Sequence, residues 1–340
     1  MNMIGTDNCS NRGSRREFPK PMQKNKGWPW SEDSIKEPLS ISDKKEYPRI
    51  SIVTPSFNQG EFIEETIRSV LLQNYPNLQY IIVDGGSSDS TIEIIKRYSP
   101  WISYWISEHD EGQSDAINKG MILADGDICA WLNSDDVLTK DALYIVGKYF
   151  NINSACMWLG GSGQLSFIGS GKKGVMKSSL SNTSILIDFW KFGKVDGCFL
   201  FQPSIFWKKS LWDKVGGLSE DYHFAMDYDL WLKFSEHTKL YSISNILSIA
   251  KRYDDCKTVG QRKAQCEELM DCSYSFVRSS GKSGLLLTVR MLVWFIMRDI
   301  RLAKYELVDK NFINTILVVF NIILLPVVMF SKKGRLSLLE

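Results

Sequence analysis

The chain of 340 residues lacks the cysteine pattern of a disulfide-bonded or zinc-binding protein. Its seven cysteines are scattered and odd in number, and none forms a Cys-x-x-Cys pair. Disulfide frameworks use even numbers of cysteines, and zinc sites commonly use Cys-x-x-Cys pairs. The sequence therefore favours reduced thiols and a cytoplasmic location.

The chain also lacks an excess of charge of either sign. The 41 Lys and Arg residues nearly balance the 39 Asp and Glu residues, which gives a formal net charge of +2. This balance gives no argument for nucleic acid as a partner, and we expect none. With 44% hydrophobic and 24% charged residues, the composition is that of an ordinary folded protein of one large or two small domains.

The first 40 residues contain no apolar run, so we expect no signal peptide. Residues 1–48 are polar and show little periodicity. We expect them to form a flexible N-terminal arm, in which the Trp-Pro-Trp segment at residues 28–30 docks on the body of the protein.

The two common glycine motifs for phosphate binding are absent. No Gly-x-Gly-x-x-Gly follows the first expected strand, and no Gly-x-x-x-x-Gly-Lys-Ser/Thr occurs. The Gly-Gly-Ser-Gly cluster at residues 160–163 does not lie between an expected strand and helix, and we interpret it as a loop. If the protein binds a nucleotide, a metal ion rather than a glycine loop must hold the phosphates.

From residue 49 onward, short apolar runs alternate with segments of helical periodicity. The alternation with short connections predicts an α/β fold, in which helices flank a Rossmann-like, mostly parallel sheet. The expected strands cover residues 50–54, 80–83, 102–106 and 128–132, and the expected helices cover residues 62–71, 91–98 and 114–123.

A polar segment follows each expected strand, at residues 55–58, 84–87, 107–110 and 133–136. Ligands of parallel α/β sheets bind outside the carboxyl ends of the strands, so these four loops predict one binding rim. We expect a domain over residues 49–260, with a nucleotide-binding part at about 49–150 and an acceptor part at about 151–260.

The last of these loops ends in the adjacent carboxylates of Asp135 and Asp136. Two such charges repel each other, and a divalent cation with oxygen ligands, which also holds a diphosphate, would relieve the repulsion. The alternative is a solvated turn with a helix N-cap. Asp227 begins a helical pattern, where it is either a first-turn acid or a general base directed into the site.

Residues 261–340 predict a helical, apolar C-terminal extension with two uncharged or nearly uncharged runs, at residues 284–297 and 313–330. A bilayer span needs about 20 residues, which makes the second run of 18 borderline. Basic residues flank both runs, so we expect an anchor in the inner leaflet of a membrane. A buried helical pair or an oligomer interface is the alternative.

Five segments together resemble family 2 glycosyltransferases, which are inverting enzymes with the GT-A fold. The resemblance covers roughly residues 48–260 and is specific because the segments occur in the family's order. They lie at residues 52–59, 83–89, 118–120, 131–136 and 226–231.

The resemblance implies a site for a nucleotide-sugar donor. Pro55 and Ser56 correspond to residues that line the nucleotide pocket, and Asp84 corresponds to a carboxylate that bonds the base, usually uracil. Asn58 and Asn118 belong to the matching segments and are assigned to the same site.

The resemblance also assigns roles to three acids. Residues 133–136 match the metal-binding "DXD" region, in which Asp135 would face the ribose or sugar and Asp136 would bind Mn²⁺ or Mg²⁺. Asp227 matches the catalytic base. Two positions depart from the family: Met226 replaces a common Glu, and a His common near Tyr253 is missing, so that Lys251, Arg252 or Lys257 would help neutralise the diphosphate.

The expected function is therefore metal-assisted, inverting transfer of a sugar from a nucleotide-sugar, most often a UDP-sugar, to an acceptor hydroxyl. The acceptor would be a saccharide or a lipid-linked saccharide of a surface polysaccharide or glycolipid, at the cytoplasmic face of the membrane. Two alternatives stay open: a catalytically inactive nucleotide-sugar-binding protein, and a nucleotidyltransferase. The second should carry a glycine- and arginine-rich triphosphate loop after the first strand, and residues 55–60 are not such a loop.

Overall fold

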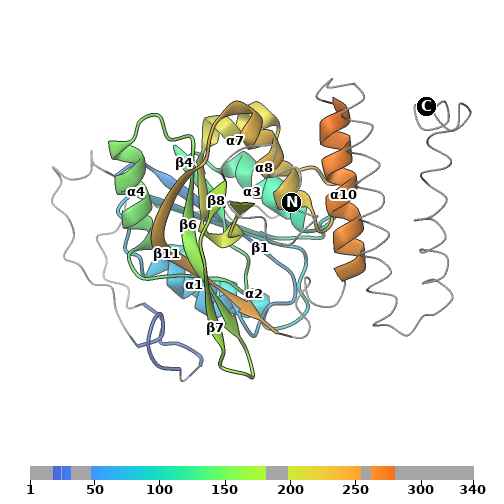
Figure 1. The fold of residues 1–340 in the computed structure, drawn as a ribbon. Coiled ribbons are helices and arrows are strands. Elements are labelled where there is room, and N and C mark those ends of the chain that lie inside the picture. Colours follow the sequence, from blue (N-terminus) through green and yellow to red (C-terminus); the bar gives the residue numbers. More distant parts are fainter. Residues whose placement is uncertain (1–17, 24, 32–46, 181–197, 254–261, 280–340) are drawn as a thin grey trace, which may run out of the picture.

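A computed structural model describes residues 18–23, 25–31, 47–180, 198–253 and 262–279 (Figure 1). Its centre is a nine-stranded sheet in the order β3-β2-β1-β4-β10-β6-β11-β5, with β7 paired to β6. Strands β8 (Ser179–Leu180) and β9 (Cys198–Phe199) form a separate pair.

The first half of the sheet is parallel, as the alternation of strands and helices predicts. It consists of β1 (Ile50–Ser56), β2 (Leu78–Asp84), β3 (Tyr104–Ser107) and β4 (Ile128–Trp131). The connecting helices are α1 (Ile63–Leu71), α2 (Thr91–Tyr98) and α3 (Gln113–Leu123). Strands β1 and β4 and most of β2 are buried, which explains why they read as apolar runs rather than as alternating patterns.

The second half of the sheet is mixed. Strand β10 (Ile205–Lys208) is antiparallel to both β4 and β6 (Trp158–Phe167), whereas β11 (Tyr241–Arg252) is parallel to β6. Strands β5 (Val137–Leu138) and β7 (Lys173–Met176) add further antiparallel pairs. The helices of this half are α4 (Ala142–Ile152), α7 (Lys209–Val215), α8 (Met226–His237) and α10 (Arg262–Ser279).

The sheet curls around the acidic loop, which we define as residues 132–136. This loop joins β4, in the middle of the sheet, to β5, which ends the strand order. Because a chain extends by at most about 3.6 Å per residue, so short a connection brings β5 back toward β4. The curl therefore places the acidic loop between the two halves of the sheet.

The glycine cluster at residues 160–163 lies within β6, so its interpretation as a loop is wrong. A Cβ at Gly163 would overlap the ring of Phe201, and a Cβ at Gly161 would overlap the side chain of Leu247. Glycine in a strand often marks such a close approach. The cluster thus serves packing against segments that are distant in sequence.

Part of the N-terminal span packs on the domain. The indole Nε1 of Trp28 donates a hydrogen bond to the carbonyl of Leu138 at 2.8 Å, and Trp30 is buried. Arg68 on α1 donates to the carbonyls of Pro19 and Pro29. The expected docking of residues 28–30 is therefore confirmed.

Of the expected C-terminal extension, the structure describes only α10, which packs against α8 beside the sheet (Figure 1). Within the described residues, no helix is both long and apolar enough to cross a membrane. The apolar runs at residues 284–297 and 313–330 lie outside the described residues.

Candidate active site

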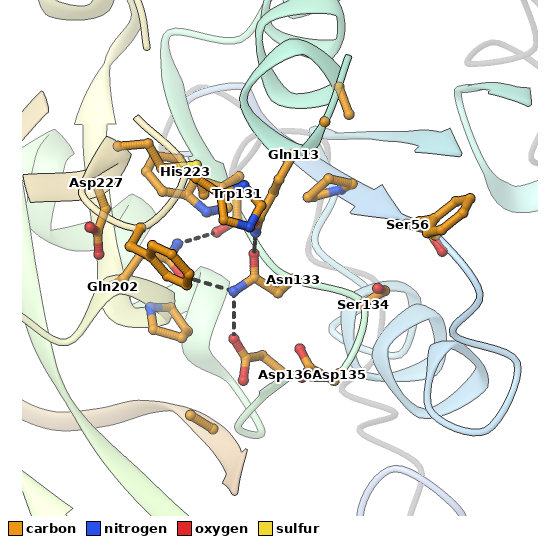
Figure 2. Close-up of a pocket in the computed structure, with 18 of the residues that line it drawn as sticks. Ser56, Gln113, Trp131, Asn133, Ser134, Asp135, Asp136, Gln202, His223 and Asp227 are labelled. Carbon is orange, nitrogen blue, oxygen red and sulfur yellow. Dashed lines mark hydrogen bonds between the residues drawn. The ribbon is translucent and has the colours of Figure 1, made fainter. Parts of the chain in front are cut away.

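A cavity of about 890 Å³ opens at the carboxyl ends of the parallel strands (Figure 2). This volume is within the range of about 300–1,000 Å³ typical of small-molecule sites. Both halves of the sheet line the cavity. Its polar lining includes Ser56, Gln59, Asp110, Gln113, Asn133, Asp135, Asp136, Gln202, His223, Asp227, Arg252 and Tyr253.

Helix α1 holds the acidic loop in place. The Thr66 hydroxyl lies 2.8 Å from the carbonyl of Ser134 and 2.7 Å from that of Asp136. Within the loop, the amide of Asp136 donates to the carbonyl of Asn133 at 3.0 Å. These contacts bury Ser134 and Asp136 and fix the backbone that carries both carboxylates.

Asn133 is the centre of a hydrogen-bond network that joins three segments of the chain (Figure 2). Its Nδ2 donates to Asp136 at 3.2 Å and to Gln202 Oε1 at 3.3 Å, and its Oδ1 accepts from Gln113 at 2.8 Å. Gln202 in turn donates to the Trp131 carbonyl at 3.1 Å. The network ties α3 and the segment before β10 to the acidic loop.

The two carboxylates of the loop have different surroundings. Asp136 is 5% exposed, and burial, together with the charge of Asp135, raises the pKa of its carboxyl well above the usual range. The positive charges of Arg252 and Lys251 and the hydrogen bond from Asn133 lower this pKa, but by less than burial and Asp135 raise it. Asp135 is half-buried and accepts a hydrogen bond from the Tyr253 hydroxyl at 2.9 Å.

The basic residues near the acids are not equivalent. Arg252 lines the cavity. Lys251 instead forms an ion pair with Glu65 at 2.6 Å and lies over the ring of Phe62. The sequence offers three cations for the diphosphate. Arg252 lines the cavity, whereas Lys251 is paired with Glu65 of α1. Lys257 lies outside the described residues.

The acidic loop fits a divalent cation whose remaining ligands come from a bound substrate. The described residues contain no group of three or more His, Cys, Asp and Glu side chains that could hold a metal ion alone. Mg²⁺ is commonly bound by one or two carboxylates together with substrate phosphates rather than by a full set of protein ligands. Two adjacent carboxylates, one of them buried with a raised pKa, provide such a partial set.

The end of β1 and the loop after it offer unused hydrogen-bonding groups to the cavity. Pro55, Ser56 and Gln59 line it. Ser56 Oγ and Gln59 Oε1 are buried and have no hydrogen-bond partner within the described part of the chain. Because buried polar atoms in folded proteins are almost always paired, these two atoms indicate a place where a ligand supplies the partner.

Asp84 and Asn58 lie behind this lining. Asp84 is fully buried and accepts hydrogen bonds from the Ser87 hydroxyl at 2.5 Å, the Ser107 hydroxyl at 2.7 Å and the Ser87 amide at 2.9 Å. Asn58, at a φ of 51°, accepts from the Ser88 amide at 2.9 Å. Both side chains shape the loops from which neighbouring residues reach the cavity.

Asn118, which the resemblance assigns to the donor site, does not line the cavity. Its side chain donates to the Leu218 carbonyl at 3.0 Å and accepts from the Leu218 amide at 3.1 Å. A weaker contact of 3.3 Å reaches Glu220. Asn118 thus bridges α3 to the segment that follows α7.

Asp227 lies in the first turn of α8 and lines the cavity from the second half of the domain (Figure 2). It is half-buried, so a molecule in the cavity can reach its carboxylate. The preceding Met226 is buried, and its sulfur accepts a hydrogen bond from Ser114 at 3.0 Å. Met226 therefore packs α8 onto α3, and of the two acids in the first turn of α8, Asp227 and Asp229, Asp227 lines the cavity.

Glu268 on α10 holds the start of α8. Its carboxylate accepts hydrogen bonds from three consecutive backbone amides, those of His223 at 2.8 Å, Phe224, and Ala225 at 2.5 Å. A carboxylate at the amino end of a helix also interacts favourably with the helix dipole. Helix α10 thus fixes the backbone that ends at Asp227.

The floor of the cavity is aromatic. Trp131 and Trp231 stack with ring centroids 5.7 Å apart, and both line the cavity while being almost fully buried. Their Nε1 atoms have no hydrogen-bond partner among the described residues. The core position expected for Trp231 is confirmed, and Trp190 lies outside the described residues.

Comparisons with known proteins agree on one family. The family model described as Glycosyl transferase family 2 matches residues 51–208. An uncharacterised glycosyltransferase of Mycobacterium tuberculosis is 30% identical over 188 residues, which cover 55% of this chain and 68% of the relative. The chain belongs to glycosyltransferase family 2.

Other family members extend the match. An uncharacterised glycosyltransferase of Rickettsia typhi is 28% identical over 250 residues, covering 71% of this chain and 75% of the relative. The putative teichuronic acid biosynthesis glycosyltransferase TuaG of Bacillus subtilis is 39% identical over 99 residues, covering 28% of this chain and 39% of the relative. The protein is therefore a glycosyltransferase, which decides against a nucleotidyltransferase.

A solved structure supports the GT-A fold. The structure of S. aureus TarS 1–349 in complex with UDP-GlcNAc superposes with a TM-score of 0.52 at 15% identity, covering 80% of this chain and 91% of that one. At this identity the likeness concerns the fold alone. The expected α/β fold of GT-A type is confirmed.

Sequence reasoning missed Gln113, which lines the cavity, and Glu268, which holds the start of α8. Each acts through residues far away in sequence, and no local pattern marks either of them. Gln202 does stand out in the sequence, as a polar residue between the apolar residues 199–201 and Pro203.

Proposed function

We propose that this glycosyltransferase moves a sugar from a nucleotide-sugar, a UDP-sugar in the first instance, to an acceptor hydroxyl with inversion at the anomeric carbon. The observation that carries the proposal is that Asp136 and Asp227, from the two halves of the sheet, line one cavity. One acid is placed for the donor's diphosphate and the other for the acceptor's proton.

The donor is assigned to the part of the domain at about residues 49–150. The unpaired atoms of Ser56 and Gln59 would bond the nucleotide, with Pro55 beside them, and Asp135 would face the ribose or sugar. Asp84, which the resemblance assigns to the base, would hold the β2 loop against the nucleotide from behind the lining, and Asn58 holds the neighbouring loop. Arg252 would offset part of the diphosphate charge from across the cavity.

Asp136, with Asp135 beside it, would hold a divalent cation, Mn²⁺ or Mg²⁺, together with the diphosphate. When bound, such a cation supplies charge stabilisation for the departing nucleotide. The network through Asn133 keeps the Asp136 carboxylate oriented toward the cavity. Thr66 keeps the loop backbone from moving as charge develops.

The acceptor is assigned to the part at about residues 151–260. Asp227 would take the proton of the acceptor hydroxyl, whose oxygen attacks the anomeric carbon on the face opposite the nucleotide. A single displacement of this kind inverts the configuration. Positioned general bases typically contribute about 10²–10⁴-fold in rate.

The acceptor class follows from relatives and from the cavity wall. TuaG is named for teichuronic acid biosynthesis, and a relative from Escherichia coli, 28% identical over 211 residues, is named chondroitin synthase. We propose a saccharide or lipid-linked saccharide of a surface polysaccharide as the acceptor. The apolar residues Leu165, Met176 and Leu200 on the acceptor side are compatible with an acceptor that carries a lipid.

A donor screen tests the proposal. The purified chain is incubated with UDP-, GDP-, dTDP- and CMP-sugars, each with Mn²⁺, Mg²⁺ or a chelator, and both thermal stabilisation and nucleotide release are measured. We expect one UDP-sugar to stabilise the protein and to yield UDP in a cation-dependent manner. Stabilisation without any release, with acceptor extracts present, would support the inactive binding protein instead. Release with retained anomeric configuration would contradict inversion.

A further inference from the structure

The hairpin formed by β6 and β7 exposes large apolar side chains at its tip. The exposed fractions are 41% for Phe167, 50% for Ile168 and 56% for Val175. We define these three residues, with Lys172 and Lys173 between them, as the hairpin tip. Figure 1 shows the hairpin projecting away from the body of the sheet.

The hairpin carries charge of one sign only. Lys172, Lys173 and Lys177 are exposed, and residues 158–180 contain no Asp or Glu. None of the three lysines forms an ion pair within the described residues. In a chain whose net charge is only +2, this local separation of charge marks a surface for an anionic partner.

The hairpin tip adjoins the mouth of the cavity. Leu165 and Met176 line the cavity, and they lie two residues before Phe167 and one residue after Val175, respectively. Because alternate strand residues share a face, Phe167 extends the apolar wall that begins at Leu165. The backbone turns at Gly169 and Gly171, with φ of 88° and 64°, so the hairpin ends in a tight turn between β6 and β7.

We propose that the hairpin tip docks on an anionic lipid surface, with Phe167, Ile168 and Val175 entering the headgroup region and Lys172 and Lys173 beside the lipid phosphates. Apolar side chains combined with lysines are the composition that binds anionic leaflets. A protein partner would need a broad surface of about 800 Å² on each side, and a narrow hairpin tip does not offer one.

Docking through the tip would turn the cavity mouth toward the bilayer. A lipid-linked acceptor could then reach Asp227 along the wall of Leu165 and Phe167 without leaving the membrane. This consequence rests on the proposed function. The lipid binding itself does not, because it is measured without donor or acceptor.

The first test compares binding of the full chain to vesicles of phosphatidylcholine with and without phosphatidylglycerol. The variants are Phe167→Ser/Ile168→Ser and Lys172→Glu/Lys173→Glu. The matched control is Lys148→Glu/Ile152→Ser, because these residues are also exposed and lie four positions apart at the end of α4. We expect both tip variants to weaken binding to the anionic vesicles at least tenfold and the control to leave it unchanged. Thermal melting with and without UDP verifies that each variant is folded.

The second test detects the tip itself in the lipid, separately from any vesicle binding by the apolar runs after residue 283. An environment-sensitive fluorophore is attached to Ile168→Cys and, as a control, to Ile152→Cys, and the labelled parent chain gives the background from native cysteines. We expect a lipid-borne quencher to quench the label at position 168 and not at 152. An unquenched label at 168 on vesicle-bound protein would overturn the proposal. So would a tip variant that changes the oligomeric state in light scattering without changing lipid binding, because the tip would then contact a second copy.

Discussion

The acidic loop and the start of α8 both present a carboxylate to the cavity, but they hold it in different ways. Asp136 is buried within a network anchored to α1 and α3, and its pKa is raised. Asp227 is half-buried in the first turn of α8, and Glu268 of α10 accepts hydrogen bonds from the backbone amides that precede this helix. A rigid buried acid suits a cation and a diphosphate, whereas an accessible acid at a helix start suits proton exchange with an acceptor. The proposed division of roles follows from this contrast.

Replacing Asp227 should give the largest change. We expect Asp227→Asn to lower the rate of transfer by about 10²–10⁴-fold, because the amide cannot take the acceptor's proton. The affinity for UDP, measured by calorimetry, should stay within about twofold, since the substitution is nearly isosteric and Asp227 is not among the proposed nucleotide residues. The exposed Asp221→Asn in the same segment is the control. Transfer at the parental rate would show that Asp227 is not the base.

Replacing Asp136 should act on the donor side instead. We expect Asp136→Asn to weaken cation-dependent UDP binding by at least about tenfold, because a neutral amide is a poor ligand for a hard divalent cation. Its melting temperature without cation should be equal to or higher than that of the parent, since a buried carboxylate with a raised pKa opposes folding when ionised. Calorimetry with Mn²⁺ and melting with a chelator measure the two effects. Cation-dependent binding equal to that of the parent would remove Asp136 from the metal site.

The raised pKa of Asp136 also predicts how cation binding responds to pH. Since the folded protein retains this proton above about pH 3.9, the ordinary Asp pKa, protons and cations compete for one carboxylate there. Cation-dependent UDP affinity should therefore rise as pH rises through the raised pKa, while stability without cation should fall over the same range. The Asp136→Asn variant, which has no proton to lose, is the control. If the UDP affinity of the variant changed with pH as steeply as that of the parent, the pH dependence would belong to another group.

The contrast also shows what could be predicted from the sequence. The parallel half of the sheet could be predicted because each strand and helix is encoded locally, as in the buried runs at residues 50–54 and 80–83. The acids Asp136 and Asp227 could be found because they belong to short ordered motifs. Gly163 and Glu268 could not, because the reason for each lies in a partner 38 and 43–45 residues away: the ring of Phe201 and the amides before α8. Local patterns contain no information on such pairs.

Glu268 allows the support of Asp227 to be tested separately from its chemistry. We expect Glu268→Gln to lower the stability by about 1–2 kcal/mol, because charge-assisted bonds to three amides are weakened. We expect kcat to fall several-fold and KM for the donor to stay unchanged, because the substitution loosens only the start of α8, which carries Asp227. Steady-state kinetics and denaturant melts measure both, and Glu267→Gln is the neighbouring control. A stability loss with unchanged kcat would limit Glu268 to a structural role.

Asn118 is expected to give the smallest effect on activity, although its motif matches the family. In the structure its side chain bridges α3 to Leu218 and does not reach the cavity. Asn118→Ala should therefore reduce the stability by about 1–3 kcal/mol through a lost pair of hydrogen bonds, while KM for the donor and kcat change less than about twofold. Donor titrations at a temperature where the variant is fully folded measure this. A donor KM raised tenfold with normal melting would place Asn118 at the nucleotide, as the resemblance alone suggests, and would extend the donor site from the acidic loop along α3.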